Sequence, residues 1–295
     1  MQLSKQDIDF CKTYNADKYP HPSLTADTVL FRIIDQLRNS KKKYPTRKLE
    51  ILLVRRAKPP FSGGWALPGG FCHMDEDTSV CAARELKEET GLEGRQLGQI
   101  AAFSAPQRDP RTRVVSVAYL ALCAYDVSTV PRADDDAVEA RWFTVECTTK
   151  AVTPDCYETE LTLKDDELVI RGVLSHMREN TFAPWRTTVK EDAELLAFDH
   201  LSVIACGVES LRDRIYTTSA AFLCVPEVFR IADLQSVFEA VMGQELLRST
   251  FYEHVKPRIR RMDQASDIPI PEQCYQYNEL FTLPDGSSAV RIINQ

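Results

Sequence analysis

Three glutamates, Glu85, Glu88 and Glu89, are the residues of this chain whose types and spacing most clearly suit chemistry. They fall in a segment whose pattern predicts a helix over residues 78–90, and residues three and four apart share one side of a helix. Without a cation, like charges placed in this way repel each other and destabilise the helix. Clustered hard oxygen ligands suit Mg²⁺ or Mn²⁺, and Mg²⁺ with few protein ligands usually handles substrate phosphates. An ordinary acidic, solvated helix is the alternative interpretation.

The glycines of the chain are concentrated beside this predicted helix. Seven of the eleven lie within residues 63–98, although the chain as a whole is poor in glycine. Gly69 and Gly70 precede the helix and would let the backbone approach a metal ion or a phosphate closely. Gly91 follows the last helical residue, where glycine commonly ends a helix. The glycines therefore mark the same stretch as the glutamates.

The spacing from Gly70 to Leu92 is specific throughout. It reads Gly70, five residues, Glu76, seven residues, Arg84-Glu85-Leu86, one residue, Glu88-Glu89, one residue, Gly91-Leu92. This pattern resembles the Nudix box and matches every fixed position of it. Over about residues 25–147 the chain resembles Nudix hydrolases, which fold as an α/β/α sandwich and use Mg²⁺ to cleave a diphosphate linked to another group. The metal ligands that the resemblance implies are Glu85, Glu88, Glu89 and the carbonyl of Gly69, and Arg84 would orient the glutamates.

The resemblance also implies a mechanism in which water attacks a phosphorus atom. The metal ions would polarise the phosphoryl oxygens, and a carboxylate would act as the general base. The box does not fix which carboxylate this is. The catalytic candidates are Glu88, Glu89 and Arg84 within the box, and Glu139 with the run Asp134-Asp135-Asp136 beyond it. A solvated turn before a strand is the alternative interpretation of that acidic run.

Basic and aromatic residues outside the box are candidates for binding the substrate. Residues 107–113 contain three arginines, and arginine can make bidentate contacts to phosphate. The sequence RDPRTRVVSVAY, which begins at Arg108, resembles Nudix domains that handle ADP-ribose; a charged hairpin loop is the alternative. We assign Trp65 to core packing in preference to base stacking. The candidate substrate-binding residues are Arg55, Arg56, Phe61, Arg108, Asp109, Arg111 and Arg113.

The C-terminal half resembles a second known architecture. Helical periodicity predicts helices from Phe198, over 231–242 and from about Leu247 to near Pro257, and Pro284-Asp285-Gly286 predicts a hairpin over 279–293. Three helices followed by a hairpin are the parts of a winged helix. The segments 196–200 and 229–243 resemble the Nudix-related transcriptional regulators of the NrtR family. That family fuses an ADP-ribose-sensing Nudix domain to a winged helix that binds operator DNA as a dimer.

The expected recognition helix departs from the family pattern. Thr250-Phe251 stands where the family has Asn-Phe, Pro257 cuts the helix short, and Glu253 would face DNA phosphates poorly. A solvated face or a dimer contact is the alternative for the basic residues that follow. The candidate DNA contacts are Arg248, Thr250, Tyr252, Lys256, Arg258, Arg260 and Arg261.

Charge and composition limit the remaining function classes. The net charge is −7, which taken globally argues against a nucleic-acid binder, and residues 199–295 are themselves net acidic. The longest apolar run, about Val114 to Tyr125, is shorter than the roughly 20 residues that a membrane helix needs. The N-terminus has no apolar signal core, and nine cysteines without a CxxC pair are typical of reduced thiols. We therefore expect a cytoplasmic protein with no membrane partner.

We expect an α/β Nudix sandwich followed by an α+β winged-helix domain. The expected divisions are a lead over 1–24, the Nudix domain over 25–150, a connecting insertion with a hairpin over 151–198, and the winged helix over 199–295. Our first hypothesis is Mg²⁺- or Mn²⁺-dependent hydrolysis of the diphosphate of ADP-ribose or a related nucleotide sugar. The alternative is an ADP-ribose-sensing, DNA-binding regulator of NAD or sugar metabolism with little or no hydrolysis. We expect a homodimer, and a winged helix that serves only dimerisation is a third possibility.

Overall fold

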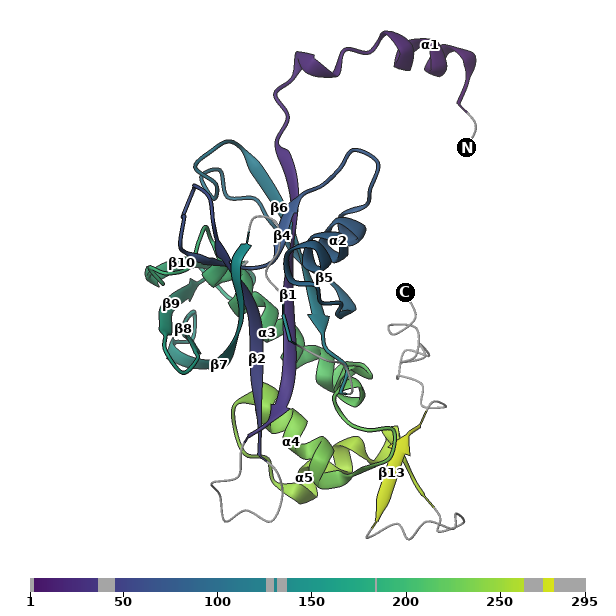
Figure 1. Ribbon diagram of the computed structural model, residues 1–295, viewed down its shortest axis with the longest axis vertical. Coiled ribbons are helices and arrows are strands. Elements are labelled where there is room, and N and C mark those ends of the chain that lie inside the picture. The colour runs from purple at the N-terminus through teal and green to yellow at the C-terminus, as the bar shows by residue number, and fades with distance from the viewer. Residues whose placement is uncertain are drawn as a thin grey trace.

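The computed structural model describes residues 3–36, 46–125, 130–131, 137–183, 185–262 and 273–278. The chain begins with helix α1 (Lys5–Thr13), which stands apart from the rest of the molecule (Figure 1). Its first turn is closed by a capping box, in which the Ser4 side chain accepts from the Asp7 backbone and the Asp7 side chain accepts from Ser4. None of the α1 residues is buried. The rest of the described chain is built around a large sheet.

That sheet has ten strands and is mixed. In chain order they are β1 (Ser23–Asp35), β2 (Arg47–Arg56), β3 (Trp65–Ala66), β4 (Gly69–Phe71), β5 (Arg95–Phe103), β6 (Val114–Leu122), β7 (Ala137–Thr153), β8 (Cys156–Lys164), β9 (Val169–Met177) and β10 (Arg186–Glu191). The spatial order is β10-β9-β8-β7-β2-β1-β6-β5, with β3 paired to β2 and β4 paired to β1. Strands β1 and β6 are parallel, so the centre of the sheet is covered on both faces, as parallel pairs require.

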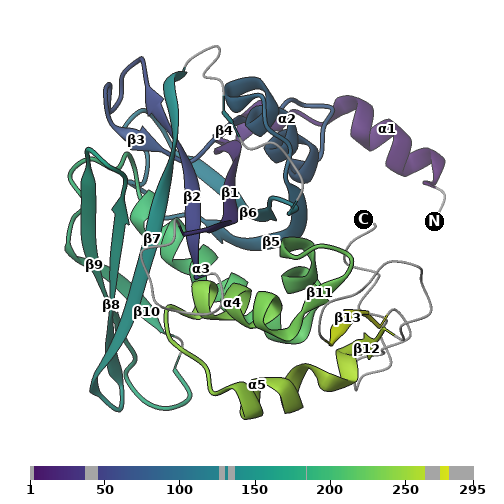
Figure 2. The same ribbon diagram turned by 60° about the horizontal axis from the view of Figure 1, so that its bottom comes forward.

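Helices cover both faces of the sheet. Successive side chains of a strand point to opposite faces, and β1 shows this directly. Leu30 packs with Leu86 of helix α2 (Thr78–Thr90), whereas its neighbours Val29 and Phe31 belong to the core that includes helix α3 (His200–Thr217). Helix α4 (Ile231–Met242) contacts β2 (Figure 2). The mixed sheet between helices fits the expected α/β sandwich.

The C-terminal part of the chain contains three helices and a small sheet, which we call the helical unit (residues 199–278). Helix α4 has the predicted bounds and ends at Gly243, whose φ of +70° lies in the left-handed region that glycine favours. Helix α5 (Arg248–Val255) follows it and stops before Pro257. The strands β11 (Phe229–Arg230), β12 (Ile259–Arg261) and β13 (Cys274–Tyr277) form an antiparallel sheet in the order β11-β13-β12. The hairpin predicted over 279–293 lies outside the described residues.

The segment expected to be a connecting insertion belongs instead to the main sheet. Strand β7 continues to Thr153, and β8, β9 and β10 add three more strands to its edge. The expected hairpin is present as β8–β9, with Lys164 opposite Val169. Residues 151–191 take this place because the alternating apolar residues Leu161, Leu163 and Ile170 reach the same core as the helical unit. The sheet and the helical unit therefore share one continuous core, with no boundary at residue 150.

Two expectations from composition concern the whole chain. All nine cysteines are free thiols, distributed over buried, partly exposed and exposed positions, as expected for scattered reduced residues. No helix in the described part of the chain is both long and apolar enough to cross a membrane.

Candidate active site

Helix α2 carries the glutamate cluster and has the predicted bounds. The Gly91 N–H donates to the Lys87 carbonyl at 2.8 Å, and the φ of +68° at Gly91 ends the helix in a left-handed turn. The inner face of the helix is buried through Cys81, Ala82 and Leu86. Burial of that face fixes the rotation of the helix about its axis. As a result, the three glutamates are turned toward the cavity described below.

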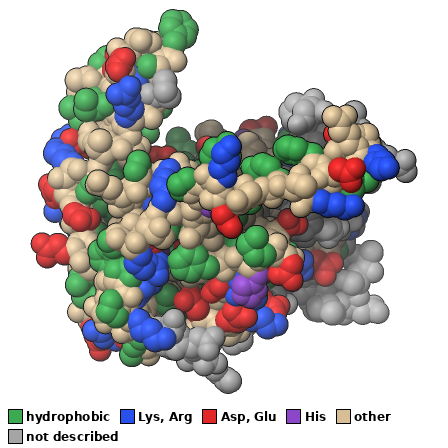
Figure 3. All heavy atoms as spheres, turned by 90° about the horizontal axis from the view of Figure 1, so that it is seen from above, with side chains coloured by type: hydrophobic (Ala, Val, Ile, Leu, Met, Phe, Trp, Pro, Cys, Tyr) green, Lys and Arg blue, Asp and Glu red, His purple; other side chains and the backbone are tan. Residues whose placement is uncertain are grey.

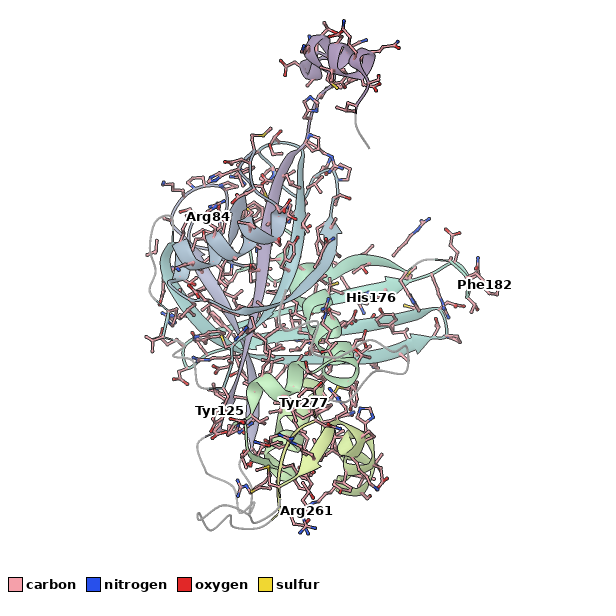
Figure 4. The ribbon with its side chains drawn as sticks, turned by 90° about the vertical axis from the view of Figure 1, so that its right-hand side faces the viewer. Arg84, Tyr125, His176, Phe182, Arg261 and Tyr277 are labelled. Atoms are coloured by element: carbon pink, nitrogen blue, oxygen red, sulfur yellow. The ribbon has the colours of Figure 1, made fainter. Side chains whose placement is uncertain are left out.

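Arg84 holds the carboxylates at the start of this cluster. Its guanidinium donates to Glu76 at 2.7 and 3.1 Å, to Glu85 at 2.8 Å and to Glu88 at 2.8 Å. The hydrogen bonds that Glu76 accepts from Arg84 and from the His73 N–H lower its pKa to about 2. Figure 4 shows Arg84 in the upper half of the molecule, below the separate helix α1. The contacts are those that an orienting role requires.

Glu89 lies deeper than the other two glutamates. Its Oε2 accepts a hydrogen bond of 3.0 Å from the Gly69 N–H. Burial raises the pKa of Glu89 to about 8, and the charges of Glu85 and Asp27 add to this rise. Burial likewise raises the pKa of Glu85. The cluster is therefore a set of partly buried carboxyl groups that repel each other when they are ionised.

Gly69 and Gly70 make the close packing of this cluster possible. A Cβ at Gly70 would lie 2.4 Å from Cδ of Glu85, and a Cβ at Gly69 would lie 2.5 Å from Oδ1 of Asp27. Real Cβ atoms essentially never come so close to another heavy atom. Glycine is therefore required at both positions, as the sequence pattern predicts.

The residues of the cluster fit a divalent cation by their chemistry. Hard carboxylate and carbonyl oxygens are the ligands that Mg²⁺ and Mn²⁺ prefer, and a cation would relieve the repulsion between the carboxylates. In the described part of the chain, no three His, Cys, Asp or Glu side chains converge as ready-made metal ligands. Arg84 holds Glu85 and Glu88, and the Gly69 N–H holds Glu89. The metal assignment therefore rests on the donor set and stays a prediction.

A cavity of about 670 Å³ opens beside the cluster. Figure 3 looks onto this end of the molecule, where acidic and basic side chains lie close together. The three glutamates and Gly69 line the cavity, and so do five of the predicted substrate-binding residues, namely Arg55, Arg56, Arg108, Asp109 and Arg111. Carboxylates for a cation and guanidinium groups for an anion thus meet in one space.

Two of the lining arginines already have carboxylate partners inside the protein. Arg108 is buried and makes a bidentate pair with Asp199 at 3.0 and 2.7 Å. Arg111 makes a similar pair with its neighbour Asp109 at 3.0 and 2.7 Å, which assigns Asp109 to holding Arg111. A ligand phosphate would therefore either displace the carboxylate that each guanidinium now binds or bind to the guanidinium together with that carboxylate.

Three predicted site residues, Phe61, Arg113 and Glu139, do not line the cavity themselves, and their roles stay predictions. Phe61 is exposed, and its ring packs on Phe198 at 4.9 Å. Arg113 donates to the carbonyls of Ser104 and Ala105. Glu139 is held by Arg141, and its Oε2 lies 3.9 Å from Nη1 of Arg55, which does line the cavity. The run Asp134-Asp135-Asp136 lies outside the described residues.

Asp27 is a cavity residue that the sequence analysis missed. It lies on β1, where it accepts a hydrogen bond from Ser116, and its Oδ2 is 3.7 Å from Nη2 of Arg108. Burial raises its pKa, which the hydrogen bond and Arg108 partly offset. A single acidic residue at the start of a strand carries no spacing signal, so only the fold reveals its place.

Phe198 and His200 are also cavity residues that were missed. Their segment pairs with β3: the Trp65 N–H donates to the Leu195 carbonyl, and the Ala197 N–H donates to the Trp65 carbonyl, both at 2.8 Å. Leu196 and Trp65 form an isolated parallel bridge. This pairing brings Phe198 and His200 to the cavity. The segment 196–200 stood out in the sequence as the start of the C-terminal helices and for its resemblance to the NrtR family, but not as part of a binding cavity.

Most of the candidate DNA contacts are exposed at the opposite end of the molecule. The exposed ones are Arg248, Thr250, Lys256, Arg260 and Arg261. Figure 4 shows Arg261 at that end, far from Arg84. Tyr252 is half-buried beside Tyr275, with ring centroids 6.4 Å apart. The basic group is therefore a surface of the helical unit, separate from the cavity.

Arg258 does not belong to this surface, which corrects its assignment. It is 3% exposed and donates to the carbonyls of Ile215, Tyr216 and Thr218 at the end of α3. Its guanidinium also lies over the ring of Phe222. Arg258 therefore satisfies the last carbonyls of a helix, where a cation is favourable.

Comparison with known proteins agrees with this geometry. Residues 37–156 match the family model described as the NUDIX domain. The "ADPR responsive transcriptional repressor NtrR" of Acinetobacter baylyi is 25% identical over 82% of this chain and 75% of its own length. An "ADP-ribose pyrophosphatase" of Methanocaldococcus jannaschii is 34% identical over 42% of this chain and 63% of its own length. The match to the second relative therefore spans less than two thirds of that protein.

A solved structure matches nearly the whole chain. The crystal structure of a MutT/nudix family protein from Enterococcus faecalis is 26% identical, with a TM-score of 0.65. The match covers 94% of each chain, so it includes the helical unit as well as the sheet. The arrangement of both parts is therefore shared with a known protein.

Proposed function

Because residues 37–156 carry a Nudix domain, we propose that this chain hydrolyses the diphosphate of ADP-ribose or a related nucleotide sugar with Mg²⁺ or Mn²⁺. The observation that carries the proposal is the complete carboxylate cluster of α2, ordered by Arg84, beside a cavity that is also lined by arginines. The relative named ADP-ribose pyrophosphatase supports the choice of substrate.

In this proposal the acidic residues of the cavity bind the cation, and the basic residues bind the phosphates of the substrate. Glu85, Glu88 and Glu89 with the Gly69 carbonyl would hold the cation, which when bound polarises phosphoryl oxygens and helps to ionise water. Arg84 keeps two of these carboxylates in place. Arg55 and Arg56 line the same cavity and present positive charge to the phosphates of a substrate. Because Glu139 lies outside the cavity wall, Glu88 and Glu89 remain our candidates for the general base.

Phe198 is the aromatic residue best placed to contact a base. It lines the cavity, while Phe61 does not, and Trp65 is buried against Phe143. The guanidinium groups of Arg56 and Arg111 lie 5.0 and 5.8 Å from the centre of its ring. An aromatic face flanked by arginines suits the stacking of a nucleotide base next to its phosphates.

The direct test is hydrolysis by the purified full chain. With Mg²⁺ it should release AMP from ADP-ribose, as measured by chromatography of the nucleotide products. The matched control is Glu89→Gln, which keeps an oxygen able to accept from the Gly69 N–H but removes the charge. Release of no AMP from ADP-ribose, together with no cleavage of other nucleoside diphosphate derivatives, would overturn the proposal.

A second candidate function is an ADP-ribose-responsive, DNA-binding regulator. Two observations favour it: the repressor relative aligns over 82% of this chain, and the described helical unit runs helix, strand, helix, helix, strand, strand, which is the order of a winged helix. Against it stand the acidic charge of this part of the chain and the buried position of Arg258. We rank it second for these reasons.

DNA binding separates the two functions. A regulator should bind DNA from upstream of its own gene at low salt and release it when ADP-ribose is added, which gel-shift titration measures. No binding at low salt would remove this function and leave dimerisation as the role of the helical unit. The homodimer itself stays a prediction, and sedimentation of the full chain tests it.

A further inference from the structure

His200 belongs to the helical unit, yet its side chain forms part of the wall of the cavity. It is the first residue of α3 and is 3% exposed. Its Nδ1 accepts a hydrogen bond of 2.9 Å from the Leu67 N–H. An imidazole that accepts at Nδ1 carries its proton on Nε2. The structure thus fixes Nε2 as a donor.

That donor has hydrogen-bonding capacity left. The Nε2 atom lies 4.0 Å from Oδ2 of Asp27, which is beyond hydrogen-bond distance, and Asp27 Oδ2 already accepts from Ser116. Within the described residues, no hydrogen bond to His200 Nε2 is formed. His200 Nε2 is not among the fully buried, unpartnered side-chain atoms of the described residues, so the atom is open to the cavity, where a ligand oxygen can accept from it.

The protonation state of His200 is also fixed. Burial lowers its pKa to about 3, and the nearby charges of Arg108 and Arg56 lower it further against the opposing effect of Asp199. Asp27 is the other charged group that faces the ring. The side chain is therefore a neutral donor through the physiological range, so its role does not depend on becoming charged.

The position of His200 indicates which part of a ligand it would meet. Asp27 faces His200 on one side, and its Oδ1 lies against Gly69 on the other. Gly69 in turn donates its N–H to Glu89. The Nε2 donor is thus one side chain away from the carboxylate cluster, at the end of the cavity where a diphosphate would lie if the proposed function holds.

We propose that His200 is a ligand-contacting residue of the cavity, whose Nε2–H donates to a phosphoryl oxygen of a nucleoside diphosphate. The inference rests on the proposed function and adds that the helical unit supplies part of the binding site. Leu67, which orients the ring through its N–H, lies in the loop that leads to Gly69. The ligand site and the first turn of α3 are therefore built together.

Two substitutions separate a ligand contact from a purely structural role. His200→Asn keeps a polar atom near the place of Nδ1, where it can accept from the Leu67 N–H, but it lacks the outer N–H. His200→Gln is longer and carries an amide N–H near the place of Nε2, but it lacks the inner acceptor. If the inference is correct, the Asn variant loses ligand affinity and the Gln variant loses stability.

The probe is the α,β-methylene analogue of ADP-ribose, which cannot be hydrolysed between its phosphates, measured with Mg²⁺ by calorimetry on the full chain. We expect His200→Asn to bind it about 10-fold more weakly than the wild-type protein and His200→Gln to bind within about threefold. Thermal melting of each variant is recorded alongside. Unchanged binding by His200→Asn, or equal losses of binding and of melting temperature in both variants, would overturn the inference.

A second probe keeps this inference distinct from the proposed function. Magnesium pyrophosphate contains the phosphoryl oxygens without the nucleoside. If the wild-type protein binds pyrophosphate but not the ADP-ribose analogue, the proposed substrate is wrong, and the same Asn and Gln comparison with pyrophosphate decides the role of His200. If it binds neither probe, both the proposed function and the inference fail.

Discussion

Two arginines at opposite ends of the molecule show how differently similar residues are used. Arg84, on α2, donates to three carboxylates and leaves a charged cluster beside an open cavity. Arg258, after α5, donates to three backbone carbonyls and is buried. Both arginines belong to charged segments that the sequence marks as functional. Arg84 orders carboxylates beside the cavity, whereas Arg258 satisfies backbone carbonyls in the interior of the fold.

The two segments differ in whether their functional candidates share a single helix or strand. The box residues Arg84 to Glu89 sit on a single helix, so their spacing alone sets their directions. The basic residues after Thr250 are divided between a short 3-10 helix (Lys256–Arg258) and strand β12. Their spacing in sequence says little about which of them reach the surface. A functional prediction is therefore firmer where its residues share one regular element.

The largest effect that tests this comparison is on catalysis. Glu88→Gln and Glu89→Gln should each lower kcat for ADP-ribose by about 10³-fold, because each removes a negative ligand or base while keeping the shape of the side chain. Steady-state kinetics with Mg²⁺ measure the loss, and circular dichroism checks that α2 still forms. Full activity in both variants would show that the glutamate cluster is an ordinary solvated helix face.

The next effect is on stability, at the other arginine. Arg258→Met should lower the free energy of unfolding by about 3 kcal/mol, because it leaves buried carbonyls at the end of α3 without a donor. Urea denaturation of the full chain measures this. The matched control is Arg261→Met on the exposed strand β12, which should change stability by less than about 0.5 kcal/mol. If the two variants are equally stable, the hydrogen bonds of Arg258 do not stabilise the fold, and Arg258 would again be a candidate for the exposed basic surface.

A pH effect at the cavity is expected to be somewhat smaller. The pKa of His200 is about 3 in the folded chain and near 6.5 when unfolded, so below pH 6.5 the unfolded chain binds a proton that the folded chain does not. Stability is therefore complete above pH 6.5 and falls as the pH drops toward 3. At pH 5 the loss is about 2 kcal/mol. The measurement is the free energy of unfolding of the wild type and of His200→Asn at pH 7 and at pH 5. The wild type should lose this stability between the two pH values, and the variant, which has no imidazole at this position, should not.

The smallest effect on stability is expected at the exposed basic residues. Replacing Lys256, Arg260 and Arg261 together by alanine should shift the free energy of unfolding by at most about 1 kcal/mol, because all three side chains are exposed. If the chain is a regulator, the same variant should lose DNA binding and show a shallower dependence of affinity on salt. Unchanged DNA binding in gel-shift titration would place the DNA contact elsewhere.

Local signals were sufficient to predict the elements that carry the box. The glycine at 91 and the apolar spacing fix α2, and the same two signals fix α4 and its end at Gly243. The core-facing alternation of β8 and β9 was visible as a hairpin, but its attachment to β7 was not. Strand pairing depends on contacts between residues far apart in sequence, which periodicity does not encode.

Part of the candidate site was likewise predictable from the sequence, and part was not. The glutamates, Gly69 and five of the seven predicted substrate residues do line one cavity. Asp27 and His200 could not be assigned to it, because the first lies about sixty residues before Glu88 and Glu89 and the second more than a hundred after them. Asp27 reaches the cavity through the place of β1 in the sheet, and His200 reaches it through the pairing of Leu196 with Trp65. Glu139 was a candidate because the box leaves the general base open and Glu139 belongs to the later acidic segment, and its role stays a prediction.

The hydrogen bonds that join Trp65 of β3 and the following residue Leu67 to residues 195–200 also bear on how the protein is made. Synthesis proceeds from the N-terminus, so the α2 helix and its glutamates leave the ribosome while His200 and the strands β8 to β10 are still to come. The cavity wall is completed only when the segment 195–200 has emerged and paired with Trp65 and Leu67. A nascent chain that contains all the glutamates of α2 therefore still lacks part of this cavity wall, which is complete only once Phe198 and His200 have been made.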